Sequence, residues 1–269
     1  MNRITTLFQQ NAIENGPGLL NVYFTAGFPD KNDTLRVLTA LQNSGADLVE
    51  IGMPYSDPVA DGETIQMSND RALSNGMTIK LLFDQLQDMR KGITVPVLLM
   101  GYINPVLQYG VEAFCQKCAE IGIDGLILPD MPMDVYEEEY KPIFDRYGVL
   151  NIFLVTPQTS EQRIRQIDAV SEGFIYTVSS ASVTGSQSGV SENMEAYFER
   201  LQSMNLKNPR LIGFGIKDHA TYSKASQYSA GAIIGSAFIR VLAEATDLEA
   251  DIASYIQSVK NPKVEAAIN

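Results

Sequence analysis

The sequence predicts an α/β protein in which residues 1–269 form a single (β/α)8 barrel. Short runs of β-branched and aromatic residues recur eight times, and stretches with a helical spacing of apolar residues lie between them. This alternation is typical of parallel βαβ units, and eight such units favour a closed barrel over a doubly wound sheet. No linker or low-complexity tract divides the chain, so we predict one domain.

The eight expected strands are nearly continuous apolar runs, which is typical of parallel strands that are covered on both faces. They span residues 19–25, 47–52, 95–100, 125–129, 151–156, 174–179, 210–215 and 232–236. No glycine-rich turn follows the first run. A dinucleotide-binding sheet is therefore disfavoured, because that turn cradles the pyrophosphate.

The expected helices place their apolar residues on one face. In the first of them, Leu35, Leu38 and Leu41 recur at helical spacing, and Ser160 stands where it can cap the third. The predicted helices span residues 33–41, 78–89, 160–170, 191–204, 217–228 and 238–259.

The charge balance excludes some classes of partner. With 20 basic and 32 acidic side chains the net charge is 20 − 32 = −12. No basic stripe is present, so we expect neither a nucleic acid nor an anionic membrane as a partner. The start of the chain has no apolar signal-peptide core, and no apolar run is long enough to span a membrane. We therefore expect a cytoplasmic protein.

Two cysteines, Cys115 and Cys118, stand at a spacing that invites a redox or zinc interpretation. One such pair supplies only half of a zinc site, and the single histidine, His219, lies far along the chain. The apolar spacing around the pair is helical. We therefore predict two reduced, partly buried helix cysteines and no metal site.

One glutamate, Glu50, stands inside the apolar run of the second expected strand. Period-two alternation places Leu48 and Glu50 on one face of that strand, and Val49 and Ile51 on the other. If Glu50 points into the barrel mouth, the loss of water raises its pKa, which suits a group that both gives and takes a proton. The alternative is a glutamate that emerges from the strand end into solvent.

Other polar residues follow the carboxyl ends of strands, where barrel enzymes carry their catalytic groups. Tyr102 and Asn104 follow the third expected strand, Asp130 follows the fourth, and Tyr176 lies on the sixth. Glycines end the last two strands: Gly215 on the seventh, and Gly235 before Ser236 on the eighth. Together with Thr184 and Gly185 in the preceding loop they indicate a phosphate site made of backbone N–H groups. Taken singly, each glycine is equally consistent with a tight turn.

The run from Glu50 to Gly62 resembles the signature of the tryptophan synthase α chain family. Four further matches follow in the same order, at residues 128–132, 182–185, 213–216 and 235–237. The resemblance implies a TIM barrel with an extra N-terminal helix, which cleaves indole-3-glycerol phosphate to indole and glyceraldehyde 3-phosphate. It also implies a β subunit as partner in an α2β2 assembly. Pyridoxal phosphate is expected only in that partner, and no cofactor in this chain.

The resemblance assigns roles residue by residue. Glu50 matches the acid–base residue, and Asp61 matches the carboxylate that accepts a hydrogen bond from the indole N–H. The residues that match the substrate pocket are Tyr23, Ile65, Tyr102, Ile127, Tyr176, Thr184, Phe214 and Ile233. The residues that match the phosphate cradle are Gly185, Gly215, Gly235 and Ser236. For Phe214, plain core packing remains an alternative.

Loops 53–61 and 179–191 acquire roles from the same resemblance. The first carries Asp61 and faces the partner, together with Asn104-Pro105 and residues 130–132; the second is expected to close over the substrate. The chain departs from the family in two places. Glu63 stands where proline is common, which can raise the pKa of Asp61 through like charge, and Ser180-Ala181-Ser182 replaces a stretch with arginine and glycine.

Two rival functions remain open from the sequence. A sugar-phosphate isomerase or epimerase keeps the barrel and the phosphate site but needs neither an aromatic slot nor a partner, and the spacing of Glu50 and Asp61 disfavours it. A catalytically weak subunit that mainly activates a β chain is the second, and the presence of both carboxylates disfavours that reading.

Overall fold

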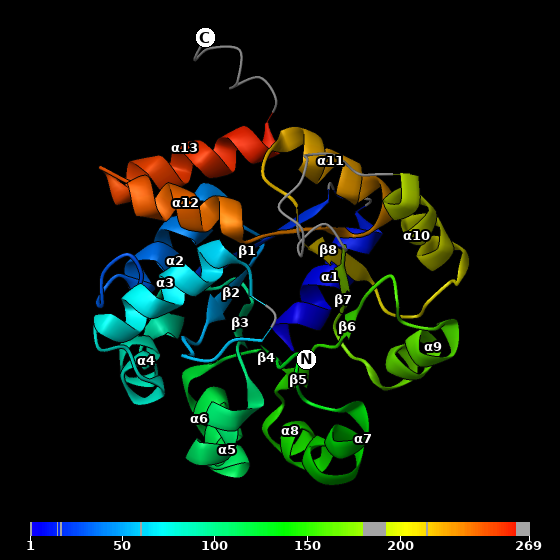
Figure 1. Ribbon diagram of the computed structural model, residues 1–269, viewed down its shortest axis with the longest axis horizontal. Coiled ribbons are helices and arrows are strands. Elements are labelled where there is room, and N and C mark those ends of the chain that lie inside the picture. The colour runs from blue at the N-terminus through cyan, green and yellow to red at the C-terminus, as the bar shows by residue number, and fades with distance from the viewer. Residues whose placement is uncertain are drawn as a thin grey trace.

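A closed ring of parallel strands organises the molecule. The computed structural model describes residues 2–14, 16, 18–59, 61–179, 192–213 and 215–261. Nine parallel strands follow one another in the order β5-β4-β3-β2-β1-β9-β8-β7-β6, and helices surround them (Figure 1). The first strand pairs with both the second and the last, which is the connectivity of an α/β barrel. The predicted fold class is confirmed.

The strands lie at the eight predicted positions, and the prediction of one continuous fifth strand is wrong. Residues 150–155 form two short strands, β5 and β6, on either side of Ile152 and Phe153. The ring still closes, because Ile152 N donates to Leu126 O (2.9 Å) and Tyr176 N donates to Phe153 O (2.9 Å). The bounds are β1 Leu19–Thr25, β2 Leu48–Gly52, β3 Val97–Met100, β4 Gly125–Ile127, β5 Leu150–Asn151, β6 Leu154–Val155, β7 Ile175–Val178, β8 Arg210–Gly213 and β9 Gly231–Ile234.

Helices occupy the outside of the ring and one of its ends. They are α1 Arg3–Ile13, α2 Thr34–Ser44, α3 Glu63–Ser74, α4 Ile79–Leu86, α5 Ile103–Tyr109, α6 Val111–Ile121, α7 Met133–Val135, α8 Lys141–Tyr147, α9 Glu161–Val170, α10 Glu192–Ser203, α11 His219–Tyr228, α12 Ser236–Glu244 and α13 Leu248–Lys260, with a 3-10 turn η1 Met89–Lys91 and a π turn η2 Tyr136–Tyr140. Ser160 caps α9 as predicted, since its hydroxyl accepts from Arg163 N at 3.2 Å.

The prediction of a single helix over residues 238–259 is wrong, because the chain forms two helices there. Ala245 adopts an extended ψ of 132° and ends α12. Asp247 then caps α13 by accepting from Ala250 N at 3.2 Å, and the Asp251 carboxylate accepts from Thr246 N at 2.8 Å. Two aspartates therefore begin a new helix at a point where the spacing of apolar residues predicted one continuous helix.

Strand alternation divides the core into two parts. On β2, Leu48 belongs to a cluster inside the barrel, whereas Val49 and Ile51 pack outward against the helices. This confirms the predicted faces of β2. Cys115 and Cys118 on α6 are free, as expected, and both are fully buried in the outer part of the core instead of partly buried. Burial raises the pKa of the Cys115 thiol to about 12, which keeps it protonated and unreactive.

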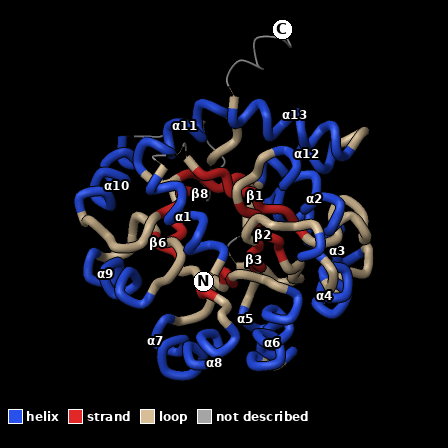
Figure 2. The backbone as a smooth tube through the Cα atoms, turned by 180° about the vertical axis from the view of Figure 1, so that it is seen from behind, coloured by secondary structure: helices blue, strands red, loops and turns tan. Residues whose placement is uncertain are grey.

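The N-terminal helix α1 covers the end of the barrel at which the strands begin, and Figure 2 shows it lying across the ring of strands. Its Ile4 and Phe8 join the barrel-interior cluster, and the Phe8 ring lies 5.5 Å from that of Phe174. Asn2 caps the helix by accepting from Ile4 N at 2.9 Å. The expected extra helix therefore closes this end of the core and leaves the opposite end for loops.

A buried aspartate, Asp124, ties this end of the barrel together. One carboxylate oxygen accepts from Arg3 Nη1 at 2.9 Å, and the other accepts from Arg90 Nη2 at 2.6 Å and Val97 N at 2.8 Å. The Asp124 side chain is 3% exposed. Helix α1, η1 and β3 thus converge on one carboxylate.

In the described part of the chain no helix is long and apolar enough to cross a membrane.

We predict that Asp124→Ala lowers the free energy of unfolding by about 3 kcal/mol, because it leaves two arginines without their buried counter-charge. Asp88→Ala is the matched control, because its ion pair with Lys91 has both side chains more than two-thirds exposed, so a loss of about 0.5 kcal/mol or less is expected. Urea denaturation of both variants measures the difference. Equal losses contradict a special role for Asp124.

Candidate active site

The predicted chemical groups gather at the carboxyl ends of the strands, opposite α1. Glu50 lies near the end of β2, and Asp61 follows the same strand two residues before α3. Tyr176 lies on β7, and Gly215 and Gly235 follow β8 and β9. Parallel pairing brings these strand ends to one mouth of the barrel, where a TIM barrel carries its catalytic groups.

Glu50 is fully buried on the inner face of β2, so the alternative of a solvent-exposed glutamate is wrong. Its Oε1 accepts a hydrogen bond from Asn21 Nδ2 of the neighbouring strand, and its Oε2 is buried without a partner in the described chain. Loss of water raises the pKa of Glu50 to about 8, although the Asn21 hydrogen bond opposes the shift. Near neutral pH this carboxyl holds a proton that it can give up.

Asp61 is half-buried and stands beside two hydrogen-bond donors. Burial raises the pKa of its carboxyl, while the Tyr102 hydroxyl and the Asn69 side chain hydrogen-bond with the charged form and oppose the rise. Burial is thus the leading cause, and the like charge of Glu63 is not needed to explain the shift. Glu63 itself is exposed in the first turn of α3, where a negative charge is favourable.

Two buried tyrosines surround the carboxylates. Burial raises the pKa of both Tyr23 and Tyr176 well above the ordinary tyrosine value, and the charges of Glu50 and Asp61 add to the rise for each ring. Both rings therefore lie within electrostatic reach of both carboxylates. Each ring packs directly against a glycine, where any larger residue would collide with it. A Cβ on Gly52 would stand 2.1 Å from the Tyr23 Oη, and a Cβ on Gly213 would stand 2.5 Å from the Tyr176 Oη.

The ends of β8 and β9 meet the requirements of a phosphate site. Gly213 pairs with Ile233, so β8 and β9 end side by side. Gly215 has a φ of 76°, a left-handed conformation that favours glycine. Gly235 is the N-cap of α12, and the first hydrogen bond of the helix runs from Ile239 N to Gly235 O at 3.0 Å. The N–H groups of Ser236 and Ala237 therefore precede the helical ladder, as an anion site requires.

The remaining pocket residues divide into three groups. Ile127 and Ile233 are buried in the barrel-interior cluster together with Tyr176. Ile65 lies on α3 and is partly buried against the outer core. The other predicted contacts, Thr184, Gly185 and Phe214, lie outside the described residues. So do residues 180–191 of the loop that is expected to close over the substrate, including Ser180-Ala181-Ser182.

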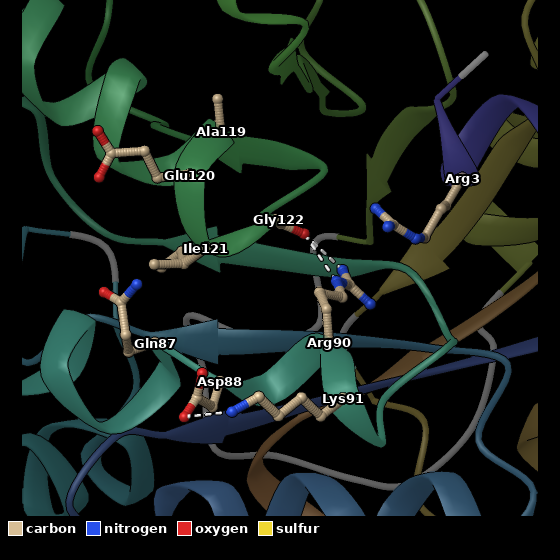
Figure 3. A pocket seen from close by; sticks show the side chains of 9 residues that line it. All are labelled: Arg3, Gln87, Asp88, Arg90, Lys91, Ala119, Glu120, Ile121 and Gly122. Carbon is tan, nitrogen blue, oxygen red and sulfur yellow. Dashed lines mark hydrogen bonds and ion pairs between the residues drawn. The ribbon is translucent and has the colours of Figure 1, made fainter.

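Two hollows elsewhere on the surface do not coincide with this mouth. One of about 440 Å³ lies between η1 and α6 at the α1 end of the barrel (Figure 3). Its cations are already engaged, since Arg90 donates to the Gly122 carbonyl and Lys91 pairs with Asp88 at 2.9 Å. The other, of about 230 Å³, lies between the segment after β4 and α9 and is lined mainly by apolar side chains. Neither Glu50 nor Asp61 lines either of these hollows.

Sequence reasoning missed two polar residues of the site, Asn21 and Asn69. Asn21 has the same inward parity on β1 as Tyr23, and an amide inside an apolar run was the available signal. Asn69 lies on α3, whose buried face is Ser68, Asn69 and Ala72. Such a face has no apolar stripe, so nothing in the pattern marked it. Within the described ranges, no three His, Cys, Asp or Glu side chains gather so that they can hold a metal ion.

Comparison with known proteins shows the family to which the chain belongs. The family model described as "Tryptophan synthase alpha chain" matches residues 8–269. The tryptophan synthase alpha chain of Flavobacterium johnsoniae is 59% identical over 244 residues, which is 91% of this chain and 94% of the relative. That of Christiangramia forsetii is 54% identical over 260 residues, which is 97% of this chain and 99% of the relative.

Solved structures agree over the same length. The crystal structure of tryptophan synthase subunit alpha from Legionella pneumophila superposes with a TM-score of 0.88 at 31% identity and covers 100% of both chains. A chain of tryptophan synthase from M. tuberculosis in its aminoacrylate-bound form gives a TM-score of 0.84 at 28% identity, covering 96% of this chain and 98% of that one. This chain therefore belongs to the tryptophan synthase alpha chain family.

Proposed function

We propose that this chain is a carbon–carbon lyase, which cleaves indole-3-glycerol phosphate to indole and glyceraldehyde 3-phosphate and passes the indole to a β subunit. One observation carries the proposal. Glu50 is fully buried and protonatable, and its Oε2 has no partner among the described residues. It shares a barrel mouth with Asp61 and with the glycine-lined ends of β8 and β9. Family membership supplies the substrate that fits this combination.

The retro-aldol reaction needs one proton delivered and one removed. Glu50 gives its proton to indole C3 and takes the proton of the side-chain hydroxyl next to the breaking bond. The carbon–carbon bond then breaks, its electron pair returns to the indole ring, and the hydroxyl carbon becomes the aldehyde. Glu50 ends the cycle protonated as it began, so no other acid or base is consumed. A pKa of about 8 suits both directions of transfer.

Asp61 supplies the compensating charge. Protonation at C3 makes the indole nitrogen positive, and an ionised carboxylate that accepts the indole N–H hydrogen bond stabilises that charge. Tyr102 and Asn69 favour the ionised form of Asp61 by hydrogen bonding. Tyr23, Tyr176, Ile127 and Ile233 supply the apolar surroundings of the ring, and Ile65 adds to them from α3. Two carboxyls in one mouth thus take opposite protonation states.

The phosphate group binds at the backbone of Gly215, Gly235 and Ser236, with Gly185 completing the cradle. Thr184 and Phe214 complete the substrate pocket. Helix N-terminal N–H groups bind a dianion without a basic side chain, which explains how a protein of net charge −12 holds a phosphate ester.

The rim around Asp61 is the surface that we assign to the β subunit, in an α2β2 assembly. Asn104 Nδ2 donates to the Tyr55 hydroxyl at 3.3 Å, and Ile103 N donates to an Asp130 carboxylate oxygen at 2.9 Å, so two loops and the start of α5 form one surface. The Tyr55 and Tyr102 rings lie 5.3 Å apart. Val59 on the first loop is 83% exposed, which suits an apolar contact with a partner. Pyridoxal phosphate belongs to that partner, and this chain needs no cofactor of its own for the cleavage.

We predict that Glu50→Gln and Asp61→Asn each lower the rate of indole release from indole-3-glycerol phosphate by more than about 10²-fold, a typical loss when an acid–base or charge-stabilising group is removed. The assay uses the purified chain with and without a β chain, and wild type is expected to release indole faster with the partner. Glu63→Gln, an exposed neighbour on α3, is the control and is expected to retain wild-type activity. If the folded wild-type chain releases no indole under either condition, the lyase proposal is wrong.

We predict a bell-shaped dependence of kcat/KM on pH. The rate falls as the pH rises through about 8, because Glu50 then loses the proton that it must deliver. It also falls at acid pH, because Asp61 must be ionised, and burial moves that limb above the ordinary aspartate range. Steady-state indole release across the pH range measures both limbs. A rate that stays constant through pH 8 contradicts the assignment of Glu50 as the acid.

We predict that Glu50 makes the free energy of unfolding depend on pH even without substrate. Below the ordinary glutamate pKa the Glu50 carboxyl is protonated in both the folded and the unfolded state, so its ionisation does not change the free energy of unfolding. Between that value and about 8 the unfolded chain releases the proton while the folded chain keeps it. Wild type therefore loses stability relative to Glu50→Gln by up to about 1.4 kcal/mol per pH unit, and the difference becomes constant above about pH 8. Urea unfolding of the two proteins at a series of pH values measures this; a constant difference throughout contradicts the buried, protonated state.

A further inference from the structure

We propose that Asn21 is a positioning residue for the reaction: its amide holds Oε1 of Glu50, so that Oε2 is the oxygen that carries the proton to and from the substrate. This inference rests on the proposed function and names a residue that the family motifs at 50–62, 128–132, 182–185, 213–216 and 235–237 do not contain.

Strand pairing places the amide beside the acid. β1 and β2 are parallel neighbours, with Asn21 opposite Leu48 and Tyr23 opposite Glu50. Asn21 therefore lies one layer deeper in the barrel than Tyr23, and its Nδ2 reaches across the strands to Glu50 Oε1. Both side chains are fully buried. Since water has no access to the pair, the hydrogen bond persists instead of exchanging with solvent.

The hydrogen bond makes the two oxygens of Glu50 unequal. An N–H donor needs a free lone pair on its acceptor, and in a carboxylic acid the carbonyl oxygen accepts better than the hydroxyl oxygen. Oε1 thus takes the carbonyl role and the proton sits on Oε2, the atom that has no partner in the described chain. Without the amide the carboxyl can rotate, and either oxygen can carry the proton.

The charged and titratable neighbours of Glu50 do not perform this task. These neighbours are Tyr23 on β1, Tyr176 on β7 and Asp61 ahead of α3. The charge of Glu50 acts on the pKa of both tyrosines, and so does the charge of Asp61. None of them is a cause of the raised pKa of Glu50, which comes from burial and is opposed by the Asn21 hydrogen bond. Only Asn21 donates a hydrogen bond to a specific oxygen of Glu50 among the contacts of the described residues.

The fold does not need an amide at position 21. The Oδ1 atom of Asn21 is buried without a partner in the described chain, and a half-satisfied buried amide costs stability relative to an apolar side chain. The neighbouring positions on the inner face of this strand and of β9, Leu19 and Ile233, are apolar. Asn21→Val removes this half-satisfied amide but also leaves Glu50 Oε1 without its donor, so a net loss of about 1–3 kcal/mol at most is expected. Urea unfolding of the variant verifies that it is folded before either test, which separates a role in the reaction from a role in folding.

The first test needs no substrate. Infrared difference spectra across a pH titration report the protonated carboxyl band of Glu50, which is identified by its loss in Glu50→Gln. In Asn21→Val the pKa of Glu50 is expected to rise, because the hydrogen bond that favours the ionised form is gone. An unchanged pKa, or a fall that signals an amide oxygen accepting from the acid, overturns the inference.

The second test is kinetic. Asn21→Val is expected to lower kcat for indole release by about 10-fold or more, with KM changed by less than about threefold, because the amide orders the acid and does not touch the substrate. The matched control is Asn151→Val. Asn151 is a buried asparagine on β5, and its Oδ1 has no partner in the described part of the chain. Its neighbour Ile152 belongs to the inner cluster and Leu150 packs against that cluster, which places Asn151 on the outer face. The control is expected to keep the wild-type kcat and the wild-type pKa of Glu50.

The two proposals fail in distinguishable ways. If wild type releases no indole but the Glu50 band shifts in Asn21→Val, the lyase function is wrong and the coupling of the pair stands. If wild type is active and Asn21→Val matches it in kcat and in the Glu50 titration, the inference about Asn21 is wrong and the function stands. An equal loss of kcat in both asparagine variants assigns the effect to packing and also overturns the inference.

Discussion

The burial of one carboxyl, Glu50, inside a closed ring of parallel strands is the constraint on which the site depends. Desolvation of that group opposes folding, because the unfolded chain hydrates the charge and the folded barrel cannot. The fold accepts this cost at one inner-face position, while the other inner residues of β2 and β3, Leu48 and Leu98, are apolar. The same burial keeps Glu50 protonated near neutral pH, so the cause of the lost stability is also the property that the proposed role of Glu50 requires.

The barrel separates stability from chemistry along its axis. At the end where the strands begin, α1 packs Ile4 and Phe8 into the interior, and Asp124 forms ion pairs with Arg3 and Arg90. At the other end, polar side chains and glycines replace this packing. Changes at the mouth therefore alter the site without opening the core, which is the general advantage of this architecture.

Contacts at the mouth connect the reacting groups to the outer rim. Tyr102 hydrogen-bonds with Asp61, its ring lies 5.3 Å from that of Tyr55, and Tyr55 accepts from Asn104. A protein bound at this rim therefore meets side chains that are one contact away from Asp61, the carboxylate that we propose stabilises the charge on the indole ring. This continuity is a physical route by which a partner can change the position or the pKa of Asp61.

The sequence by itself determined the eight strand positions, the inward face of β2 and the candidate carboxylates, because strand period and the local run of residues 50–62 are properties of neighbouring residues. Only the tertiary structure decided what depends on residues far apart in the chain: the split of the fifth strand, the break between α12 and α13, and the contacts of Asn21 with Glu50 and of Asn69 with Asp61. Helix α3 escaped prediction because its buried face is polar and small. A hydrogen bond between two strands follows from their register in the closed barrel, and no periodicity within a single strand encodes that register.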